Sequence, residues 1–200
     1  MAAATTMAVT PVVLEGTAVR LEPLTMAHHA ALTAVGLDEE LWRLSPAQVR
    51  TAADMAAYIG VALAEQAAGR ALPFAIVERA GGTVVGSTRY GAIDRNHRRL
   101  EIGWTWLGRA WQRTAINTEA KLLLLQHAFE TLGCLRVELK TDALNQQSRT
   151  AILRIGATQE GILRQHVRCV SGRMRDTVYF SILASEWPDV RRRLDQRLSA

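Results

Sequence analysis

The sequence predicts an α/β domain with a mixed, strongly twisted and mostly antiparallel sheet that contains a central parallel strand pair and carries helices on both faces. Three observations support this fold class. Short alternating strand patterns recur along the chain, glycine turns join neighbouring strands, and one long amphipathic helix separates two strands. A strand, a crossover helix and a second strand form a βαβ unit, whose two strands normally pair in parallel.

Before residue 91 the sequence predicts two helices and three strands. In chain order they are a strand at 19–23, a helix from Thr25 to about Val35, a helix that begins at Thr51, and strands at 72–79 and 84–90. Threonine is a favoured N-cap, and apolar residues follow Thr51 at helical spacing. Gly81 and Gly82 tolerate the positive φ angles of a tight turn, so the last two strands should form an antiparallel hairpin.

The second half of the chain contains the crossover. Its predicted elements are a strand at 99–107, a helix at 118–132, a strand at 135–140, a short helix between Asn145 and Gly156, strands at about 162–170 and 176–183, and a C-terminal helix at about 186–198. The helix at 118–132 carries a broad apolar stripe and ends at Gly133. Because this helix connects two strands, they are expected to be the parallel pair.

The composition fits a single domain. With 200 residues, 48% of them hydrophobic, the chain can bury a core without cross-links, and we expect one domain at 14–200 after a flexible tail at 1–13. Cys134 and Cys169, the two cysteines, are not spaced for a disulfide framework or a metal site. No apolar run reaches the roughly 20 residues of a membrane span, and the tail lacks the pattern of a secretory signal. The sequence therefore predicts a cytoplasmic protein without a metal.

The net charge of +5 rests almost wholly on arginine, with clusters at 95–99 and 191–193. Two explanations remain open: solvated protein faces, or a partner that is acidic or bears nucleic acid. No direct contact with nucleic acid is expected, and the sequence is compatible with a homodimer.

A strand, a tight loop and a helix N-terminus follow one another between residues 101 and 118. The first turn of a helix leaves backbone N–H groups unpaired and carries partial positive charge. A loop that leads into such a turn can hold a phosphate group. We therefore expect the loop at 112–117 to bind a phosphorylated ligand.

Five sequence words, three of them in or overlapping this region, resemble a known family. The words are Glu101-Ile102-Gly103-Trp104, Gln112-x-x-Ala115-x-Asn117, Asn117-Thr118-Glu119-Ala120, Asn145-x-x-Ser148 and Gly156-Ala157-x-x-Glu160-Gly161-x-Leu163-Arg164. They look like the GCN5-related N-acetyltransferases, in the branch that contains the ribosomal-protein alanine acetyltransferases of the RimJ/RimL type. The resemblance runs from about Leu14 to Ser185. It implies a sheet whose central parallel strands splay apart, and acetyl-coenzyme A as cosubstrate.

The resemblance also implies where acetyl-coenzyme A binds. Its pyrophosphate would lie on a loop of six residues, Gln112, Arg113, Thr114, Ala115, Ile116 and Asn117. Its pantetheine arm would lie in the gap between the splayed strands, paired to backbone groups of Trp106 and Leu107, where one N–H could stabilise the oxyanion. Asn145 is a helix cap, a pantetheine contact or both. Arg113 is either a cation for the pyrophosphate or a solvated loop arginine.

The loop departs from the family pattern at two positions. The family has Gly where this chain has Ala115, and Gly or Ala where it has Asn117. A positive φ at position 115 would cost alanine roughly 1–2 kcal/mol, whereas a helical φ adds only a methyl group. We expect the helical case, because the ligand needs mainly N–H groups.

The strand at 99–107 supplies the candidate general base. Alternation predicts one face with Glu101, Gly103, Thr105 and Leu107, and a core face with Ile102, Trp104 and Trp106. Glu101 is the candidate base for the amine. The alternative is an ion pair with Arg89, Arg98 or Arg99, or a capped strand end.

Four further residues are candidates for the reaction site. The resemblance makes Ser148 a candidate acid for the departing thiolate, although a thiol with a pKa of about 8.5 leaves readily without much help. Tyr90, Trp104 and His166 are candidate residues of the acceptor pocket. Core burial is the alternative for Trp104, and a structural role is the alternative for His166.

The expected reaction is direct acetyl transfer from acetyl-coenzyme A to a primary amine in a ternary complex, without an acylated cysteine. An α-amine with a pKa of about 8 needs less help to lose its proton than a lysine at about 10.4, which favours a protein N-terminus or a small-molecule amine. Two alternatives remain open. One is a transferase that detoxifies an antibiotic or an amino-acid-like amine, and the other is a non-catalytic coenzyme A sensor.

Overall fold

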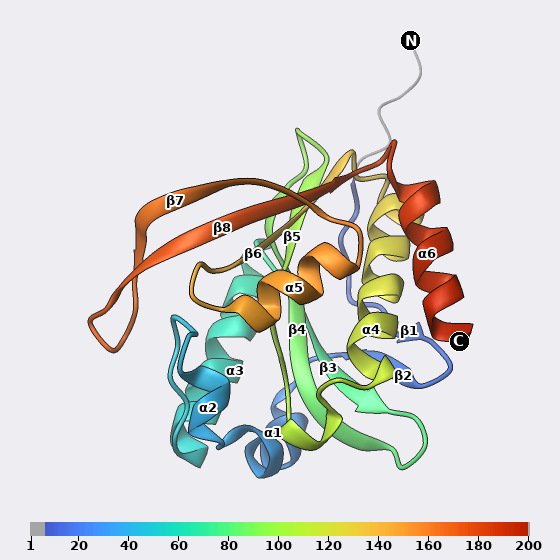
Figure 1. Cartoon of the computed structure of the whole chain (residues 1–200). Coiled ribbons are helices and arrows are strands. Elements are labelled where there is room, and N and C mark those ends of the chain that lie inside the picture. Colours follow the sequence, from blue (N-terminus) through green and yellow to red (C-terminus); the bar gives the residue numbers. More distant parts are fainter. Residues whose placement is uncertain (1–6, 200) are drawn as a thin grey trace.

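In the computed structural model, which describes residues 7–199, the chain folds around one eight-stranded sheet (Figure 1). The strand order is β1-β2-β3-β4-β5-β6-β8-β7. The strands are β1 (Leu14–Glu15), β2 (Val19–Pro23), β3 (Leu72–Glu78), β4 (Thr83–Asp94), β5 (Arg99–Leu107), β6 (Arg136–Asp142), β7 (Thr158–Arg168) and β8 (Met174–Leu183). Among these described strands, β5 and β6 pair in parallel and all other neighbours are antiparallel. The predicted fold class is confirmed.

Helices cover both faces of the sheet. They are α1 (His29–Gly36), α2 (Glu39–Trp42), α3 (Ala52–Ala67), α4 (Ala115–Gln126), α5 (Gln146–Arg154) and α6 (Trp187–Ser199), with 3₁₀ turns at Met26–His28 and Arg109–Trp111 and a π-helical turn at His127–Thr131. Two apolar clusters fill the space between helices and sheet. The larger cluster contains side chains of α4, α5 and α6, and the smaller one contains side chains of α1, α2 and α3. Figure 1 shows the two helix groups on opposite sides of the strands.

The parallel strands stay together over only a short length. Arg99, Leu100 and Glu101 of β5 pair with Arg136, Val137 and Glu138 of β6. Beyond these pairs, β5 continues to Leu107 and β6 to Asp142 without further pairing to each other. The two strands therefore splay apart, as the family resemblance implies, and Glu101 is the last residue of β5 with a partner on β6.

β5 is also distorted at Trp104. This residue has a φ of 51°, and the register with β4 shifts beside it. A bulge adds one residue to a strand, so the side chains beyond it change face. Leu107 consequently packs with Ile102 in the larger cluster, and Trp106 packs in the smaller one. The predictions that Leu107 shares the face of Glu101 and that Trp104 lies in the core are wrong, since Trp104 is 47% exposed.

The predicted flexible tail covers residues 1–13, of which 1–6 lie outside the described residues. Met7 is 2% exposed, and Val9 and Val12 pack against the larger cluster. The described part of this segment therefore covers the core instead of hanging loosely.

Candidate active site

The N-terminus of α4 lies where the phosphate-binding loop was predicted. The helix begins at Ala115, earlier than the predicted start at residue 118, because Thr114 is the N-cap and accepts a hydrogen bond from the N–H of Ile116 at 3.4 Å. Ala115 and Asn117 are helical, so neither position requires glycine. The positive φ of the loop, 61°, falls on Arg113. Helix N-termini of this kind have backbone N–H groups that can bind a phosphate.

Gln112 joins this loop to two other elements. Its side-chain amide donates to the carbonyl of Leu107 at 3.1 Å, and its side-chain oxygen accepts from Gln147 of α5 at 3.4 Å. Asn145 is the N-cap of α5 and accepts from the N–H of Ser148 at 2.9 Å. The structure therefore brings together the loop and the start of α5, two segments predicted to hold different parts of one cosubstrate.

At the splay, Trp106 and Leu107 can contact a ligand only through backbone groups, because their side chains are buried. Trp106 is 8% exposed and its ring packs 5.4 Å from Trp42, while Leu107 is 6% exposed on the opposite face. The carbonyl of Leu107 is already engaged by Gln112. The remaining unpaired backbone of β5 faces the gap that opens between β5 and β6.

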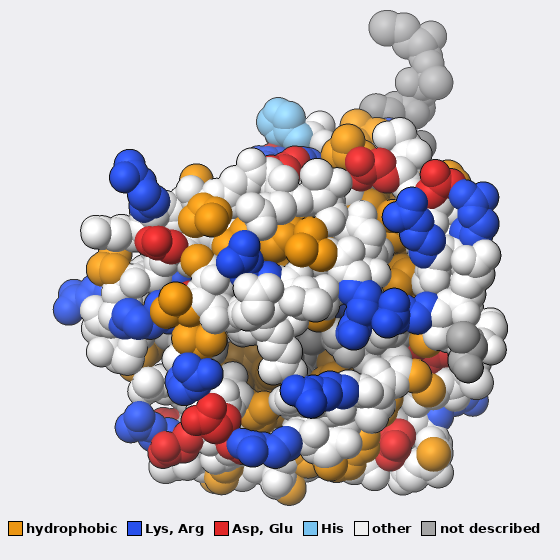
Figure 2. Space-filling view, in the orientation of Figure 1, with side chains coloured by type: hydrophobic (Ala, Val, Ile, Leu, Met, Phe, Trp, Pro, Cys, Tyr) orange, Lys and Arg blue, Asp and Glu red, His pale blue; other side chains and the backbone are white. Residues whose placement is uncertain are grey.

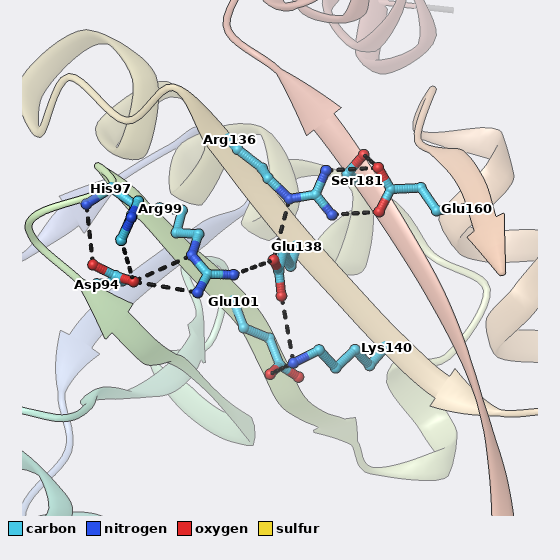
Figure 3. Close-up of polar contacts among 9 residues, drawn as sticks. All are labelled: Asp94, His97, Arg99, Glu101, Arg136, Glu138, Lys140, Glu160 and Ser181. Carbon is cyan, nitrogen blue, oxygen red and sulfur yellow. Dashed lines mark hydrogen bonds and ion pairs between the residues drawn. The ribbon is translucent and has the colours of Figure 1, made fainter. Parts of the chain in front are cut away.

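Glu101 lies at the vertex of this gap. It is 8% exposed, and its Oε2 accepts from Nζ of Lys140 at 2.9 Å (Figure 3). The ion pair foreseen as an alternative role is therefore present, but its partner is Lys140 on β6 and none of the three predicted arginines. A Cβ on Gly103 would lie 2.8 Å from Oε1 of Glu101, so the glycine provides space for the carboxylate.

Lys140 connects Glu101 to a chain of ion pairs that crosses the parallel strands (Figure 3). Glu138 contacts Lys140 at 3.4 Å, Arg99 at 3.2 Å and Arg136 at 3.1 Å. Burial acts to lower the pKa of Lys140, but the charge and hydrogen bond of Glu101, together with the charges of Tyr179 and Glu138, outweigh burial and the pKa is raised. Lys140 therefore remains a cation beside the candidate base at neutral pH.

The aromatic candidates are divided between the two faces of β4 and β5. Tyr90 is fully buried in the larger cluster, and its hydroxyl donates to the carbonyl of Leu124 at 2.6 Å. The prediction that Tyr90 borders the acceptor pocket is wrong, because it points away from the face of Glu101. Trp104 instead folds over β4, where a Cβ on Gly91 would lie 2.4 Å from its ring. Gly91 is the register partner of Glu101, so this ring lies beside the candidate base.

His166 is exposed on β7, the edge strand that β6 and β8 separate from β5. Its ring centroid is 5.7 Å from that of Tyr179, and Nζ of Lys140 lies 4.6 Å from the Tyr179 ring centroid. His166 is therefore linked to Glu101 through Tyr179 and Lys140 and does not contact it directly.

Sequence analysis missed a buried base behind β5. Lys121 of α4 is 6% exposed, and its Nζ donates to Oγ1 of Thr105 at 2.6 Å, which shares a hydrogen bond of 2.7 Å with Thr88. Burial lowers the pKa of Lys121 to about 7. The signal was its spacing, because Lys121 is four residues before the buried Leu125 and so lies on the apolar stripe of the helix.

The surface around the splay is hollowed and basic. Figure 2 shows a hollow below the position that α5 occupies in Figure 1, with hydrophobic side chains on its floor and Lys and Arg side chains around it. Within residues 7–199, no three His, Cys, Asp or Glu side chains are grouped so that they could hold a metal ion. The same part of the chain contains no helix long and apolar enough to cross a membrane.

Comparison with known proteins identifies the family. A family model described as an acetyltransferase (GNAT) domain matches residues 18–158, which include the splayed strands, the loop, α4 and α5. The chain belongs to the GCN5-related N-acetyltransferases. The family predicted from the sequence is confirmed, and the protein is an acyltransferase of this family.

Several relatives have been described. The protein named "Putative ribosomal N-acetyltransferase YdaF" of Bacillus subtilis is 34% identical over 106 residues, which are 53% of this chain and only 57% of that relative. A GCN5-related N-acetyltransferase of Brucella melitensis is 34% identical with a TM-score of 0.87, covering 94% of this chain and 86% of that chain. RimJ of Mycobacterium smegmatis, in complex with CoA-disulfide, shares the fold with a TM-score of 0.80 at 24% identity, covering 94% and 95% of the two chains.

Proposed function

We propose that the protein transfers an acetyl group from acetyl-coenzyme A to a primary amine, on a protein N-terminus or a small molecule, by direct attack in a ternary complex. The splay of β5 and β6 beyond Glu101 carries this proposal. The gap exposes strand backbone that can pair with a pantetheine arm, and the capped α4 N-terminus can receive the pyrophosphate. Arg113 adds a cation at that end, and the complex of RimJ with CoA-disulfide supports the choice of cosubstrate.

Glu101 at the vertex and Ser148 of α5 would perform the chemistry. Glu101 accepts the amine proton, directly or through one water, and an N–H of splayed β5 stabilises the oxyanion. Ser148 is the candidate donor to the departing thiolate. Cys134 and Cys169 are 2% and 4% exposed, and burial raises the pKa of Cys134 to about 11, which favours direct attack over an acylated cysteine.

Binding of the cosubstrate can be tested by heat denaturation. Acetyl-coenzyme A should stabilise the folded protein, by about 2.7 kcal/mol at about 100 times its Kd. Ala115→Glu should remove this stabilisation, because it places a negative charge in the first turn of α4. Ala110→Glu introduces the same charge at another exposed alanine and should preserve it. Equal stabilisation of both variants would place the pyrophosphate elsewhere.

The role of Glu101 can be tested through a pair of variants. As a base, Glu101→Gln should lower turnover by about 10²–10⁴-fold, with partial recovery at high pH where more of the amine is neutral, and cosubstrate binding should persist. Lys140→Met breaks the same ion pair but keeps the carboxylate, so it should remain active. If Glu101 served only the ion pair, both variants would lose stability similarly and keep wild-type turnover per folded molecule.

A further inference from the structure

Arg89 of β4 emerges on the same face of the sheet as the candidate base. It is the register partner of Gly103 on β5, and opposite residues of an antiparallel pair project to one face. Glu101 is two residues before Gly103 and shares that face, since the bulge comes only at Trp104. The Arg89 side chain therefore starts one strand away from the vertex of the splay.

Arg89 is a buried cation without a carboxylate partner. It is 3% exposed, its Nε is buried and has no hydrogen-bond partner, and its guanidinium forms no ion pair among residues 7–199. The arginines that do form ion pairs have side chains 26–67% exposed. The nearby carboxylates are occupied, because Glu65 makes two hydrogen bonds to Arg70 and Glu101 pairs with Lys140.

Two aromatic rings contact the guanidinium. Its Cζ lies 5.2 Å from the ring centroid of Tyr58 and 5.0 Å from that of Trp104. Such cation–π contacts stabilise the cation without using its N–H donors, which remain for a ligand. Trp104 reaches this position because its positive φ and the missing side chain of Gly91 let the ring fold over β4.

We propose that Arg89 binds a carboxylate of the acceptor, so that the preferred substrate is an anionic primary amine. This inference rests on the proposed acetyl transfer and specifies its acceptor. A buried, unpaired charge is strongly unfavourable, and a carboxylate matches the guanidinium edge with paired hydrogen bonds. The position of Arg89 beside Glu101 requires that the carboxylate lie only a few bonds from the amine. Free amino acids and peptides with an acidic first residue share this chemistry.

The chemical step is unchanged by this recognition. The amine nitrogen forms a bond to the acetyl carbon, the bond from that carbon to sulfur breaks, and the amine proton leaves to the base. Arg89 acts only on binding and orientation of the acceptor, through a group that does not react. Its substitution should consequently distinguish acceptors that differ in charge alone.

The test uses acceptors matched in pairs that differ in one carboxylate. One pair is a free amino acid and its carboxamide, and the other is a peptide that begins with Asp and the same peptide that begins with Asn. Thiol release from acetyl-coenzyme A is measured with wild type, Arg89→Gln, Arg89→Lys and the surface control Arg192→Gln, which changes an exposed arginine of α6. Because amine pKa values differ within a pair, the quantity compared is the ratio of variant to wild-type kcat/KM for each acceptor.

Arg89→Gln should lower kcat/KM about 10- to 100-fold for at least one carboxylate acceptor and leave its neutral partner within a few-fold, with an intermediate loss in Arg89→Lys. Arg192→Gln should change neither. The pair that responds tells whether the source is a free amino acid or a peptide N-terminus. Equal losses for charged and neutral acceptors, or thiol release with neutral amines only, would overturn the inference, as would no turnover of any anionic amine while acetyl-coenzyme A still stabilises the protein.

Failure of the proposed function gives a different result, since acetyl-coenzyme A would then neither stabilise the protein nor release thiol with any amine. If Arg89→Gln does not fold, product inhibition of the wild-type protein tests the recognition of the carboxylate. N-acetyl amino acids should inhibit at lower concentration than their amides. Equal inhibition by the two products would refute recognition of the carboxylate.

Discussion

Replacing Lys121 by methionine should stabilise the protein at neutral and lower pH and flatten the dependence of its stability on pH. Methionine retains the length and apolar stem of the buried side chain. It removes an ammonium group that is 6% exposed, has no ion pair among the described residues, and is bound to the hydroxyl of Thr105. Burial lowers the pKa of this lysine from 10.5 to about 7.

The sign of the effect follows from proton binding. Between pH 7 and 10.5 the unfolded chain carries a proton on Lys121 that the folded protein lacks, so the free energy of unfolding contributed by this group rises with pH over that window. Each tenfold change in the acid constant is worth about 1.4 kcal/mol, which sets an upper limit of about 5 kcal/mol for the whole window. Below about pH 7 both states are protonated and the penalty is constant.

Urea unfolding of wild type and Lys121→Met between pH 6 and 10 measures this difference. The advantage of the variant should be largest at pH 6–7 and should shrink as the pH rises. Lys140→Met is the matched control, because the pKa of Lys140 is raised instead of lowered. These are the two lysines of the chain, so side-chain NMR can follow each one directly. Parallel curves for wild type and Lys121→Met would refute the low pKa of the buried lysine.

Two further predictions concern buried contacts around β2 and β4. Glu119→Ala should destabilise the protein by about 3 kcal/mol or more, because the buried carboxylate accepts hydrogen bonds from the N–H groups of three consecutive residues at 17–19. Glu15→Ala, at an exposed position, should have little effect in the same urea assay. Gly91→Ala should lower the free energy of unfolding by about 1–3 kcal/mol, because the new methyl group displaces the Trp104 ring. In a Trp104→Ala background most of this loss of stability should vanish, and an unchanged loss would contradict the contact between Gly91 and the ring.

The elements that sequence analysis predicted well are those that depend on local pattern. β5 has the predicted bounds, Thr51 caps α3, and Asn145 caps α5. Alternation, helical spacing and capping residues each act over a few residues, so one sequence suffices to find them. The start of α4 was misplaced because Ala115 and Asn117 were assigned to the loop by comparison with the family pattern, while Thr114 is the residue with capping chemistry.

The arrangement of the site depended on information that is not local. The bulge at Trp104 adds one residue to β5, and a shift of one residue reverses every later side chain between the two faces. The alternation of apolar and polar residues at 99–107 does not indicate this bulge. The partner of Glu101 likewise follows from the parallel register, which places Glu138 opposite Glu101 and Lys140 two residues beyond. The nearby arginines were more conspicuous in the sequence, but among the described residues none of them forms an ion pair with Glu101.

The same distortion of β5 links the two sides of the sheet. Thr105, just after the bulge, turns toward α4 and receives the hydrogen bond from Lys121. Trp104, at the bulge itself, turns the other way, folds over Gly91 and covers one face of the Arg89 guanidinium. A regular strand would send Thr105 to the face of Glu101 and Trp104 into the core. The irregular residue in this strand therefore creates both the buried lysine site behind the sheet and the stacked arginine beside the candidate base.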